Sequence, residues 1–397
     1  MSAARAVALE VVTRVFEHGA YADRVFRSAS AGLDGRERAF AMQLAYGTVQ
    51  RVRTLDHAIE ALGRRPVRNL DPPVRAALRT GAYQLAYMDG VPAHAAVDET
   101  VKLVRAAGLE RAVGFANAVM RRLSEGLPGV LARLHEQTPE AAALLHSYPD
   151  WVAATWWREL GPDDARALLR AQNEPPETAV RTPEGPRVVD AVPPEWLESG
   201  YAWPQSRGSQ LAGVAVGARP GERVLDLCAA PGGKATQLAA LGAEVVAVER
   251  HAGRARELEE NARRLRAERL TVLHADALAL PADVVGFDRA LVDAPCSGLG
   301  VLNSRPDLRW RAEPLPDVQL ALLRAAVERV RPGGTVTYSV CTVNGAENEA
   351  VVDALGLPVE DLSGLGPEYR HPRRPEFLLT LPHVHRTSGF FVARMRT

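Results

Sequence analysis

The sequence predicts a multidomain protein with three parts: an all-α bundle in residues 1–125, a small α/β linker domain in residues 126–215, and a Rossmann-like α/β domain with a mostly parallel sheet in residues 216–397. Three observations support this prediction. The first third carries apolar residues at helical spacing, the middle part is rich in proline and tryptophan, and the last part alternates strand-like apolar runs with helical segments.

The N-terminal third reads as helical from residue 3 onward. Val7, Val11 and Val15 recur every four residues, and glycine and proline positions divide the stretch into helices of ordinary length, which predicts a bundle of five to eight helices. Residues 1–125 hold 18 Lys and Arg against 13 Asp and Glu, although the whole chain has no net charge. This basic excess suits phosphate contact, but solvated helix faces would give the same imbalance.

The middle part contains most of the tryptophans and many prolines. Because tryptophans more often fill a core or a domain interface than stack on bases, we expect a small connecting α/β domain here. The tryptophans in question are Trp151, Trp156, Trp157, Trp196 and Trp203.

The C-terminal part alternates strand-like and helical segments, which is typical of βαβ repetition and a doubly wound parallel sheet. A final strand near residues 389–394 could insert antiparallel beside its neighbour. Strands are expected at 223–227, 244–248, 270–273, 288–292 and 335–339, and helices near 234–241, 252–267 and 316–330.

Composition excludes several classes of protein. The chain has no run of about 18 apolar residues and no signal-peptide core, so a cytoplasmic protein is expected. Three cysteines, an odd number, argue against a disulfide framework, and their spacing does not match a zinc site, so no metal is expected. A monomer is the simplest expectation.

A glycine-rich turn follows the first predicted strand and indicates a cofactor loop. Its sequence, DLCAAPGGK (226–234), lacks both the dinucleotide fingerprint and the phosphate-loop pattern, which favours a ligand without a pyrophosphate. Glu249 ends the second strand, where it can accept ribose hydroxyls, and Asp276 follows the third, near an adenine amino group. Each acid alone could equally be a cap or turn residue. Together the three strand ends describe S-adenosylmethionine, with candidate ligands Cys228, Ala229, Ala230, Pro231, Gly232, Gly233, Lys234, Glu249, Arg254, Asp276 and Asp293.

Further motifs carry a resemblance to a known family. They are DAPCSGLG (293–300), RPDLRW (305–310), RPGG (331–334), YSVCT (338–342) and ENE (347–349). With the glycine loop, they resemble the successive motifs of the Sun/Fmu family of RNA 5-methylcytosine methyltransferases over roughly residues 170–397. Residues 3–125, with FANAVMR (115–121) and LAYM (85–88), are similar to the NusB-like RNA-binding domain of one branch of that family. That branch includes the bacterial enzyme that methylates one cytosine of 16S rRNA.

The resemblance implies a role for each reactive residue. Cys341 would be the nucleophile that adds to cytosine C6, since a thiolate is soft and strongly nucleophilic. Cys296 would assist loss of the C5 proton and release of the product, and Asp293 would bind the N3/N4 edge and support protonation. The implied target is a cytosine near helix 31 of 16S rRNA, and Asp226 is expected to orient the loop or the methionine amino group. Each cysteine viewed singly would be a buried core thiol.

The sequence departs from the family motif beside Cys341. The motif usually has Thr where Val340 stands, so a hydroxyl is missing there.

Several alternative functions stay open. A DNA cytosine methyltransferase would use Cys296 as the nucleophile. A tRNA substrate is a further possibility, and so is a non-catalytic RNA-binding factor with the same fold. A substrate cytosine must leave its stack, which favours a loop or single strand. Candidate phosphate contacts are Arg51, Arg53, Arg121 and Arg122.

Overall fold

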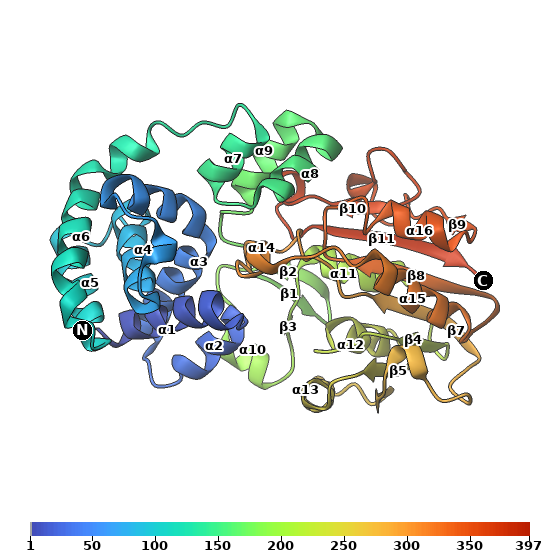
Figure 1. Cartoon of the computed structure of the whole chain (residues 1–397). Coiled ribbons are helices and arrows are strands. Elements are labelled where there is room, and N and C mark those ends of the chain that lie inside the picture. Colours follow the sequence, from blue (N-terminus) through green and yellow to red (C-terminus); the bar gives the residue numbers. More distant parts are fainter. Residues whose placement is uncertain (1) are drawn as a thin grey trace. The chain divides into compact units, whose positions relative to one another are not determined.

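The computed structural model describes residues 2–397, and the chain falls into two compact units. The helical unit comprises the chain up to Asn173 together with Leu302–Arg311. The sheet unit comprises Glu174–Val301 and Ala312–Thr397. Figure 1 shows both along the chain, from the blue N-terminal helices to the red C-terminal strand. Among residues 2–397, no helix is long and apolar enough to cross a membrane, and no group of three or more His, Cys, Asp or Glu could hold a metal ion.

The helical unit confirms the predicted bundle. Its helices are α1 (Ala3–His18), α2 (Ala22–Ala29), α3 (Gly35–Gly63), α4 (Pro72–Tyr87), α5 (Ala93–Ala106), α6 (Glu110–Leu131), α7 (Pro139–His146), α8 (Asp150–Leu160), α9 (Pro162–Ala171) and α14 (Leu308–Arg311), with a 3-10 turn η1 at Val67–Asn69. The apolar stripe of α1 is buried as its spacing predicts, and it packs with Leu44 of α3 and Leu78 of α4 in one core. The long α3 begins after Asp34, whose side chain accepts a hydrogen bond from the Glu37 N–H.

A buried arginine fixes α14 within the helical unit. The Arg309 guanidinium is fully buried, lies 3.9 Å from the Tyr148 ring centre, and donates to the carbonyls of Gln50 and Gln172 at 3.2 and 3.1 Å. Burial lowers the pKa of Arg309 to about 10, so the side chain stays charged at neutral pH. The two terminal nitrogens of this guanidinium donate to carbonyls and its plane lies on a ring, and these contacts tie residues 302–311 to the core of the unit.

The main sheet of the sheet unit has the strand order β10-β11-β8-β7-β4-β5-β6, with β9 paired to β11. Strands β4 to β8 are parallel, and β11 pairs antiparallel with both β8 and β10, which confirms the inserted last strand. The strands are β4 (Arg223–Asp226), β5 (Glu244–Glu249), β6 (Leu270–His274), β7 (Phe287–Asp293), β8 (Val330–Val340), β9 (Val359–Glu360), β10 (Leu378–Thr380) and β11 (Phe390–Arg396).

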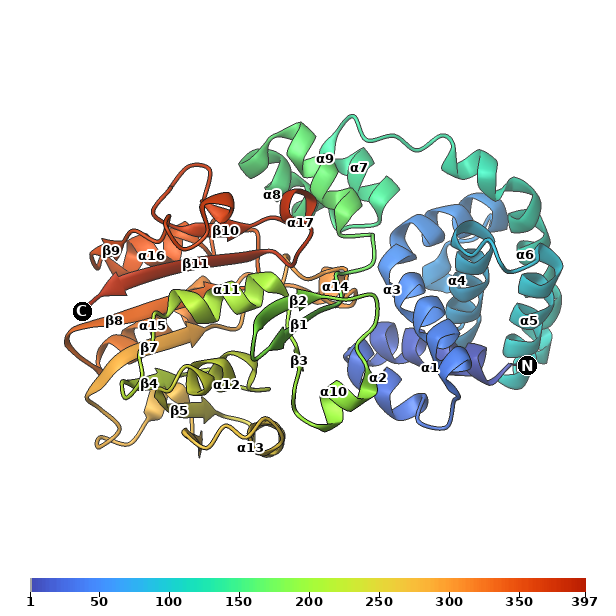
Figure 2. The same cartoon turned by 180° about the vertical axis from the view of Figure 1, so that it is seen from behind.

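Helices pack against this sheet, α11 beside α12 and α15 beside α16 (Figure 2). The helices and 3-10 turns are α10 (Pro194–Glu198), α11 (Arg207–Ala215), α12 (Gly233–Ala240), α13 (Ala252–Arg264), η2 (Ala277–Ala279), α15 (Pro316–Val327), α16 (Glu349–Leu355), η3 (Pro367–Tyr369) and α17 (Pro382–His385). The parallel strands with helical crossovers confirm the Rossmann-like prediction for this part of the chain.

The expected middle domain, residues 126–215, is divided between the two units. Its first part forms the end of α6 and helices α7 to α9, which belong to the helical unit, where Trp156 is fully buried. Its second part belongs to the sheet unit and contains a small antiparallel sheet of order β2-β1-β3. Those strands are β1 (Ala179–Thr182), β2 (Gly185–Val188) and β3 (Trp203–Pro204). Helices α7, α8 and α9 pack on one another, and α7 also packs against α3, which attaches this half to the bundle.

Candidate active site

The reactive side chains collect at one edge of the main sheet. Strand β4 lies between β5 and β7, and β7 pairs with β8, all in parallel. Their carboxyl ends therefore meet, at Asp226, Glu249, Asp293 and Val340. In the β7–β8 register Asp293 lies opposite Ser339, so the segments that follow these strands, with Cys296 and Cys341, begin side by side.

The glycine loop joins β4 to α12 and brings its backbone close to neighbouring side chains. Gly232 has a φ of +110°, and a Cβ there would meet a Leu258 methyl at 2.6 Å. A Cβ on Gly233 would lie 2.9 Å from the Trp203 indole nitrogen. Only glycine fits both positions, and the turn leaves the first N–H groups of α12 directed out of the loop.

Glu249 and Arg254 support this loop from the end of β5. The Glu249 carboxylate is buried, accepts the His251 N–H at 2.7 Å, and lies 3.4 Å from the Arg254 guanidinium. Arg254 also donates to the Ala230 carbonyl at 2.6 Å. Asp276 is exposed and caps η2 by accepting the Leu278 N–H at 3.0 Å, which is the turn role that its position also allowed.

Asp226 is a buried carboxyl group with one oxygen unpartnered. It is 1% exposed; one oxygen accepts the Cys228 N–H at 3.4 Å, and the other has no hydrogen-bond partner among the described residues. Burial, followed by the charge of Asp293, raises the pKa of Asp226 to about 7. Burial also raises the pKa of the Cys228 thiol far above its usual range, so Cys228 lines the loop as an un-ionised thiol.

Lys234 and Asp293 form an ion pair beside this loop. The Lys234 ammonium is 2.7 Å from one Asp293 oxygen, and the Ser339 hydroxyl donates to the other at 2.9 Å. The Lys234 nitrogen also lies 4.8 Å from the centre of the Phe390 ring on β11. The sequence predicted Lys234 as a cofactor ligand, and in the structure its ammonium group contacts Asp293. Sequence reasoning did not identify Ser339 or Phe390, whose roles depend on strand register.

The two cysteines that the sequence singled out are in contact. The Cys296 and Cys341 sulfur atoms are 3.4 Å apart, although 45 residues separate them in the chain. The distance does not show which thiol donates the hydrogen bond, so the groups around each sulfur must be considered.

The surroundings of the pair are electrically asymmetric. The hydrogen bond from Cys296, with a smaller contribution from the positive charge of Lys234, lowers the pKa of Cys341 although burial and the negative charge of Asp293 act to raise it. The same bond, burial and the negative charge of Glu347 raise the pKa of Cys296. Cys341 is therefore the better thiolate and Cys296 the thiol that donates to it.

The four arginines proposed for RNA contact have different surroundings. Arg53 donates to the Tyr148 carbonyl at 2.6 Å and pairs with Asp150 at 2.8 Å, and Arg51 lies over the Tyr87 ring at 4.8 Å. These two side chains are engaged within the helical unit.

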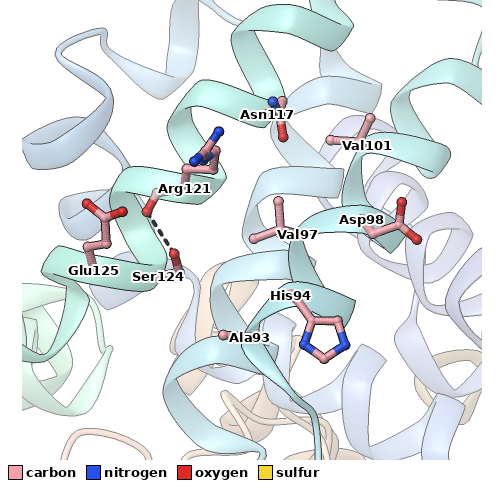
Figure 3. A pocket seen from close by; sticks show the side chains of 9 residues that line it. All are labelled: Ala93, His94, Val97, Asp98, Val101, Asn117, Arg121, Ser124 and Glu125. Carbon is pink, nitrogen blue, oxygen red and sulfur yellow. Dashed lines mark hydrogen bonds between the residues drawn. The ribbon is translucent and has the colours of Figure 1, made fainter.

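Arg121 and Arg122 on α6 are exposed. Arg122 donates to the Ala118 carbonyl at 3.3 Å, and Arg121 lines an open pocket of about 440 Å³ between α5 and α6 (Figure 3). Asp98 and Glu125 line the same pocket, so its charge is mixed. Of the four arginines, these two have the guanidinium groups most open to a phosphate.

Comparison with known proteins identifies both parts of the chain. A family model described as 16S rRNA methyltransferase RsmB/F matches residues 214–396, and the NusB family model matches residues 2–125. The fold of the whole chain is similar to that of the crystal structure of PH0851, with a TM-score of 0.82 at 20% identity over 100% of this chain and 99% of that one.

The chain is also similar to relatives along most or all of its length. The chain is 31% identical to a probable ribosomal RNA small subunit methyltransferase B of Synechocystis, over 100% of both chains. It is 35% identical to the ribosomal RNA small subunit methyltransferase B of Thermus thermophilus, over 90% of this chain and 85% of the relative. The resemblance to the Sun/Fmu family is thereby confirmed, and the chain belongs to the RsmB/F family of 16S rRNA methyltransferases.

Proposed function

We propose that the protein transfers a methyl group from S-adenosylmethionine to C5 of a cytosine in 16S small-subunit rRNA, through a covalent bond between Cys341 and C6. The observation that carries this proposal is the pair of sulfur atoms 3.4 Å apart at the carboxyl edge of the sheet, in a chain that belongs to this family. A merely structural thiol pair would not need the Lys234–Asp293 ion pair beside it.

The residues of the glycine loop fit the proposed cofactor. The unpartnered Asp226 oxygen is buried, so an ammonium group such as that of the methionine part would satisfy it. Gly232 and Gly233 leave room for close approach, and Glu249 offers a carboxylate at the end of β5 for ribose hydroxyls. Asp276 is the candidate for the adenine amino group. When bound, S-adenosylmethionine supplies an electrophilic methyl group.

Cys341 would activate the target ring. Cytosine C5 is a poor nucleophile, and addition of the Cys341 thiolate at C6 makes C5 the nucleophilic carbon of an enamine. After C5 has gained the methyl group, it must lose its proton, and Cys296 assists that loss. The electron pair of the C5–H bond restores the C5=C6 double bond, and the C6–S bond breaks to return Cys341 as a thiolate.

Asp293 and Lys234 would hold the polar edge of the base. A carboxylate oxygen of Asp293 can accept from the cytosine amino group. The proton that N3 gains as C6 is attacked can come from the Lys234 ammonium by way of the Asp293 oxygen that it contacts. The neighbouring Ser339 hydroxyl keeps the carboxylate oriented toward this position. This arrangement requires a base that has left its stack, as in a loop or single strand.

RNA contact would involve the exposed arginines of the helical unit. Arg121 and Arg122 are the favoured phosphate contacts; Arg51 and Arg53 could take part only by giving up their present partners. An rRNA substrate implies a cytoplasmic location. All the residues named here belong to one chain, so a monomer would be sufficient for the reaction.

A methyl-transfer assay tests the proposed substrate. Wild-type protein would be incubated with methyl-labelled S-adenosylmethionine and unmodified 16S rRNA, and with unmodified tRNA in parallel, before nucleoside mass spectrometry. We expect label in 5-methylcytosine from 16S rRNA, at one position near helix 31. Label in tRNA alone would move the substrate to tRNA, and label in neither RNA would favour a non-catalytic RNA-binding factor.

A further inference from the structure

A fully buried carboxylate, Glu347, lies between the two cysteine-bearing segments. It occupies the turn between β8 and α16 and is 0% exposed. One of its oxygens accepts from the Ser297 N–H at 2.9 Å, the Leu315 N–H at 3.1 Å and the Gln319 side-chain amide at 2.9 Å. Because every partner of this oxygen is a fixed N–H donor, only an acceptor fits there.

The second Glu347 oxygen accepts from three side chains. They are the Ser297 hydroxyl, the Thr342 hydroxyl at 3.4 Å and the Asn344 amide at 3.3 Å. The Ser297 and Thr342 hydroxyl oxygens are themselves 2.8 Å apart. A single carboxylate thus gathers donors from the segment after β7, the start of α15 and the segment after β8.

The position of these donors in the sequence relates Glu347 to the active site. Ser297 directly follows Cys296, and Thr342 directly follows Cys341. The same two segments also meet through the Gly300 N–H, which donates to the Cys341 carbonyl at 3.0 Å. The spacing of the two sulfur atoms therefore depends on contacts made one residue further along each segment.

The Tyr338 hydroxyl fixes the backbone of Glu347 itself. It donates to the Glu347 carbonyl at 2.6 Å from within β8, and its side chain is fully buried. Both the backbone and the carboxylate of Glu347 are therefore held to the sheet. A buried charge is costly unless all its hydrogen-bonding capacity is met, as it is here.

We propose that Glu347 is a positioning residue for the cysteine pair: by bridging Ser297 and Thr342, it holds the Cys296 and Cys341 sulfur atoms in contact. The expected effect of Glu347 on methyl transfer rests on the proposed function. The charge of Glu347 also lies on the side of Cys296, where it helps to keep that thiol protonated as a donor to Cys341.

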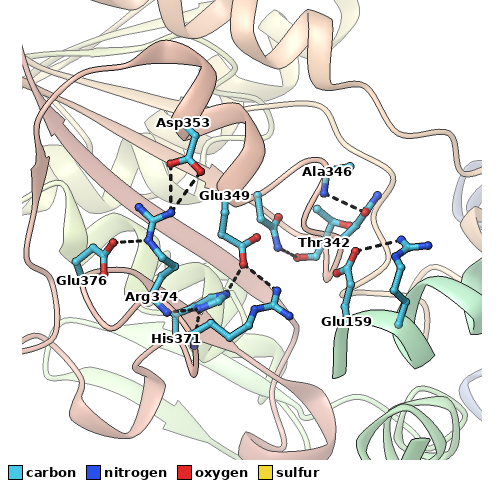
Figure 4. Close-up of polar contacts among 12 residues, drawn as sticks. Glu159, Thr342, Ala346, Glu349, Asp353, His371, Arg374 and Glu376 are labelled. Atoms are coloured by element: carbon cyan, nitrogen blue, oxygen red, sulfur yellow. Dashed lines mark hydrogen bonds and ion pairs between the residues drawn. The ribbon is translucent and has the colours of Figure 1, made fainter. Parts of the chain in front are cut away.

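The test compares Glu347→Gln with Glu349→Gln. Glutamine has the shape of glutamate but no charge. Its NH2 group would face backbone N–H donors at the first oxygen position, and at the second position it could bond the Ser297 and Thr342 hydroxyls only by reversing the direction of the present hydrogen bonds. Glu349 is the first residue of α16, two positions after Glu347, and is also bonded, to His371 at 2.8 Å and Arg373 at 3.2 Å, but neither partner adjoins a cysteine (Figure 4). It is therefore a matched control for loss of a carboxylate in this region.

Two readouts are needed, and the first requires no RNA. Diamide removes the two thiol hydrogens of a close dithiol and leaves a disulfide, which peptide mass spectrometry can assign to Cys296 and Cys341. We expect closure to be slowed about tenfold or more in Glu347→Gln, and kcat on rRNA to fall by about 10²-fold with little change in KM, because small displacements of reacting groups are costly. Glu349→Gln should match wild type in both.

The outcomes separate the two proposals. Wild-type closure and wild-type kcat in Glu347→Gln would overturn the positioning role. Slow closure in Glu347→Gln, in a preparation whose wild type methylates no RNA, would support the positioning role and overturn the proposed function. If Glu347→Gln does not fold, Thr342→Val removes one bridge while keeping the carboxylate, and unchanged closure and kcat in that variant would overturn the proposal.

Discussion

The Cys341 sulfur lies 3.4 Å from the Cys296 sulfur, and the two thiols have different charged neighbours: Asp293 and Lys234 act on Cys341, and Glu347 acts on Cys296. Lys234 lowers the pKa of Cys341, and Glu347 raises that of Cys296. This difference favours the later cysteine as the thiolate, which is the role that the family resemblance implies. A DNA-type mechanism would require the opposite assignment.

The first prediction concerns thiol reactivity. Iodoacetamide should modify Cys341 in preference to Cys296, and Cys228 should react only after unfolding because burial raises its pKa. In Cys296→Ala the donor to the Cys341 thiolate is lost, so the pKa of Cys341 should rise and its alkylation profile should move to higher pH. Peptide mass spectrometry across pH measures this. An unmoved profile would mean that Cys296 does not donate to Cys341.

The second prediction concerns the pH dependence of cofactor binding. The pKa of Asp226 is raised to about 7, and an ammonium ligand binds its ionised form. The Kd for S-adenosylhomocysteine should therefore fall as pH rises from about 6 to about 8, since protonation of Asp226 competes with binding below its pKa. Asp226→Asn should bind more weakly and lose this dependence. Calorimetry that finds the same pH dependence in both proteins would exclude Asp226 as the ligand.

The third prediction concerns RNA affinity. The double variant Arg121→Ala/Arg122→Ala should bind rRNA more weakly, and the slope of log K against log salt should decrease in magnitude by about 1.4 if both side chains contact single-stranded phosphates. Arg219→Ala, an exposed arginine of the sheet unit, is the control. Filter binding at several salt concentrations gives the slopes. Equal slopes for the double variant and wild type would place the RNA elsewhere.

The fourth prediction concerns acid stability. The hydrogen bond and charge of His371 help lower the pKa of Glu349 to about 2, below its ordinary value of 4.5. The contacts of the ionised Glu349 carboxylate therefore stabilise the fold above pH 4.5, and this contribution, of up to about 3 kcal/mol, is lost as pH falls from 4.5 towards 2. Urea midpoints of wild type and Glu349→Gln should differ at neutral pH and converge in acid. A constant difference would contradict the shift.

The sheet and its edge could be predicted because strand and helix signals are local. The apolar runs at 223–227 and 244–248 became β4 and β5, and the tail became the antiparallel β11. The same reasoning selected Cys296, Cys341 and the glycine loop, which all follow predicted strands.

The sequence could not reveal contacts that depend on tertiary packing. Membership of residues 302–311 in the helical unit depends on the carbonyls that surround Arg309, which lie far away in sequence. Likewise, the motif that includes Glu347 was identified from the sequence, but the hydrogen bonds of Glu347 were not. They join it to Ser297, 50 residues earlier in the chain, and to Thr342, 5 residues earlier. Hydrophobic periodicity carries no information about such polar contacts.

The most direct test of the central claim is adduct trapping on rRNA. Wild type, Cys341→Ala and Cys296→Ala would be incubated with labelled S-adenosylmethionine and unmodified 16S rRNA, then separated on denaturing gels. We expect a covalent protein–RNA adduct that accumulates in Cys296→Ala, with neither adduct nor methyl transfer in Cys341→Ala. Methyl transfer by Cys341→Ala together with an inactive Cys296→Ala would contradict it and make Cys296 the nucleophile.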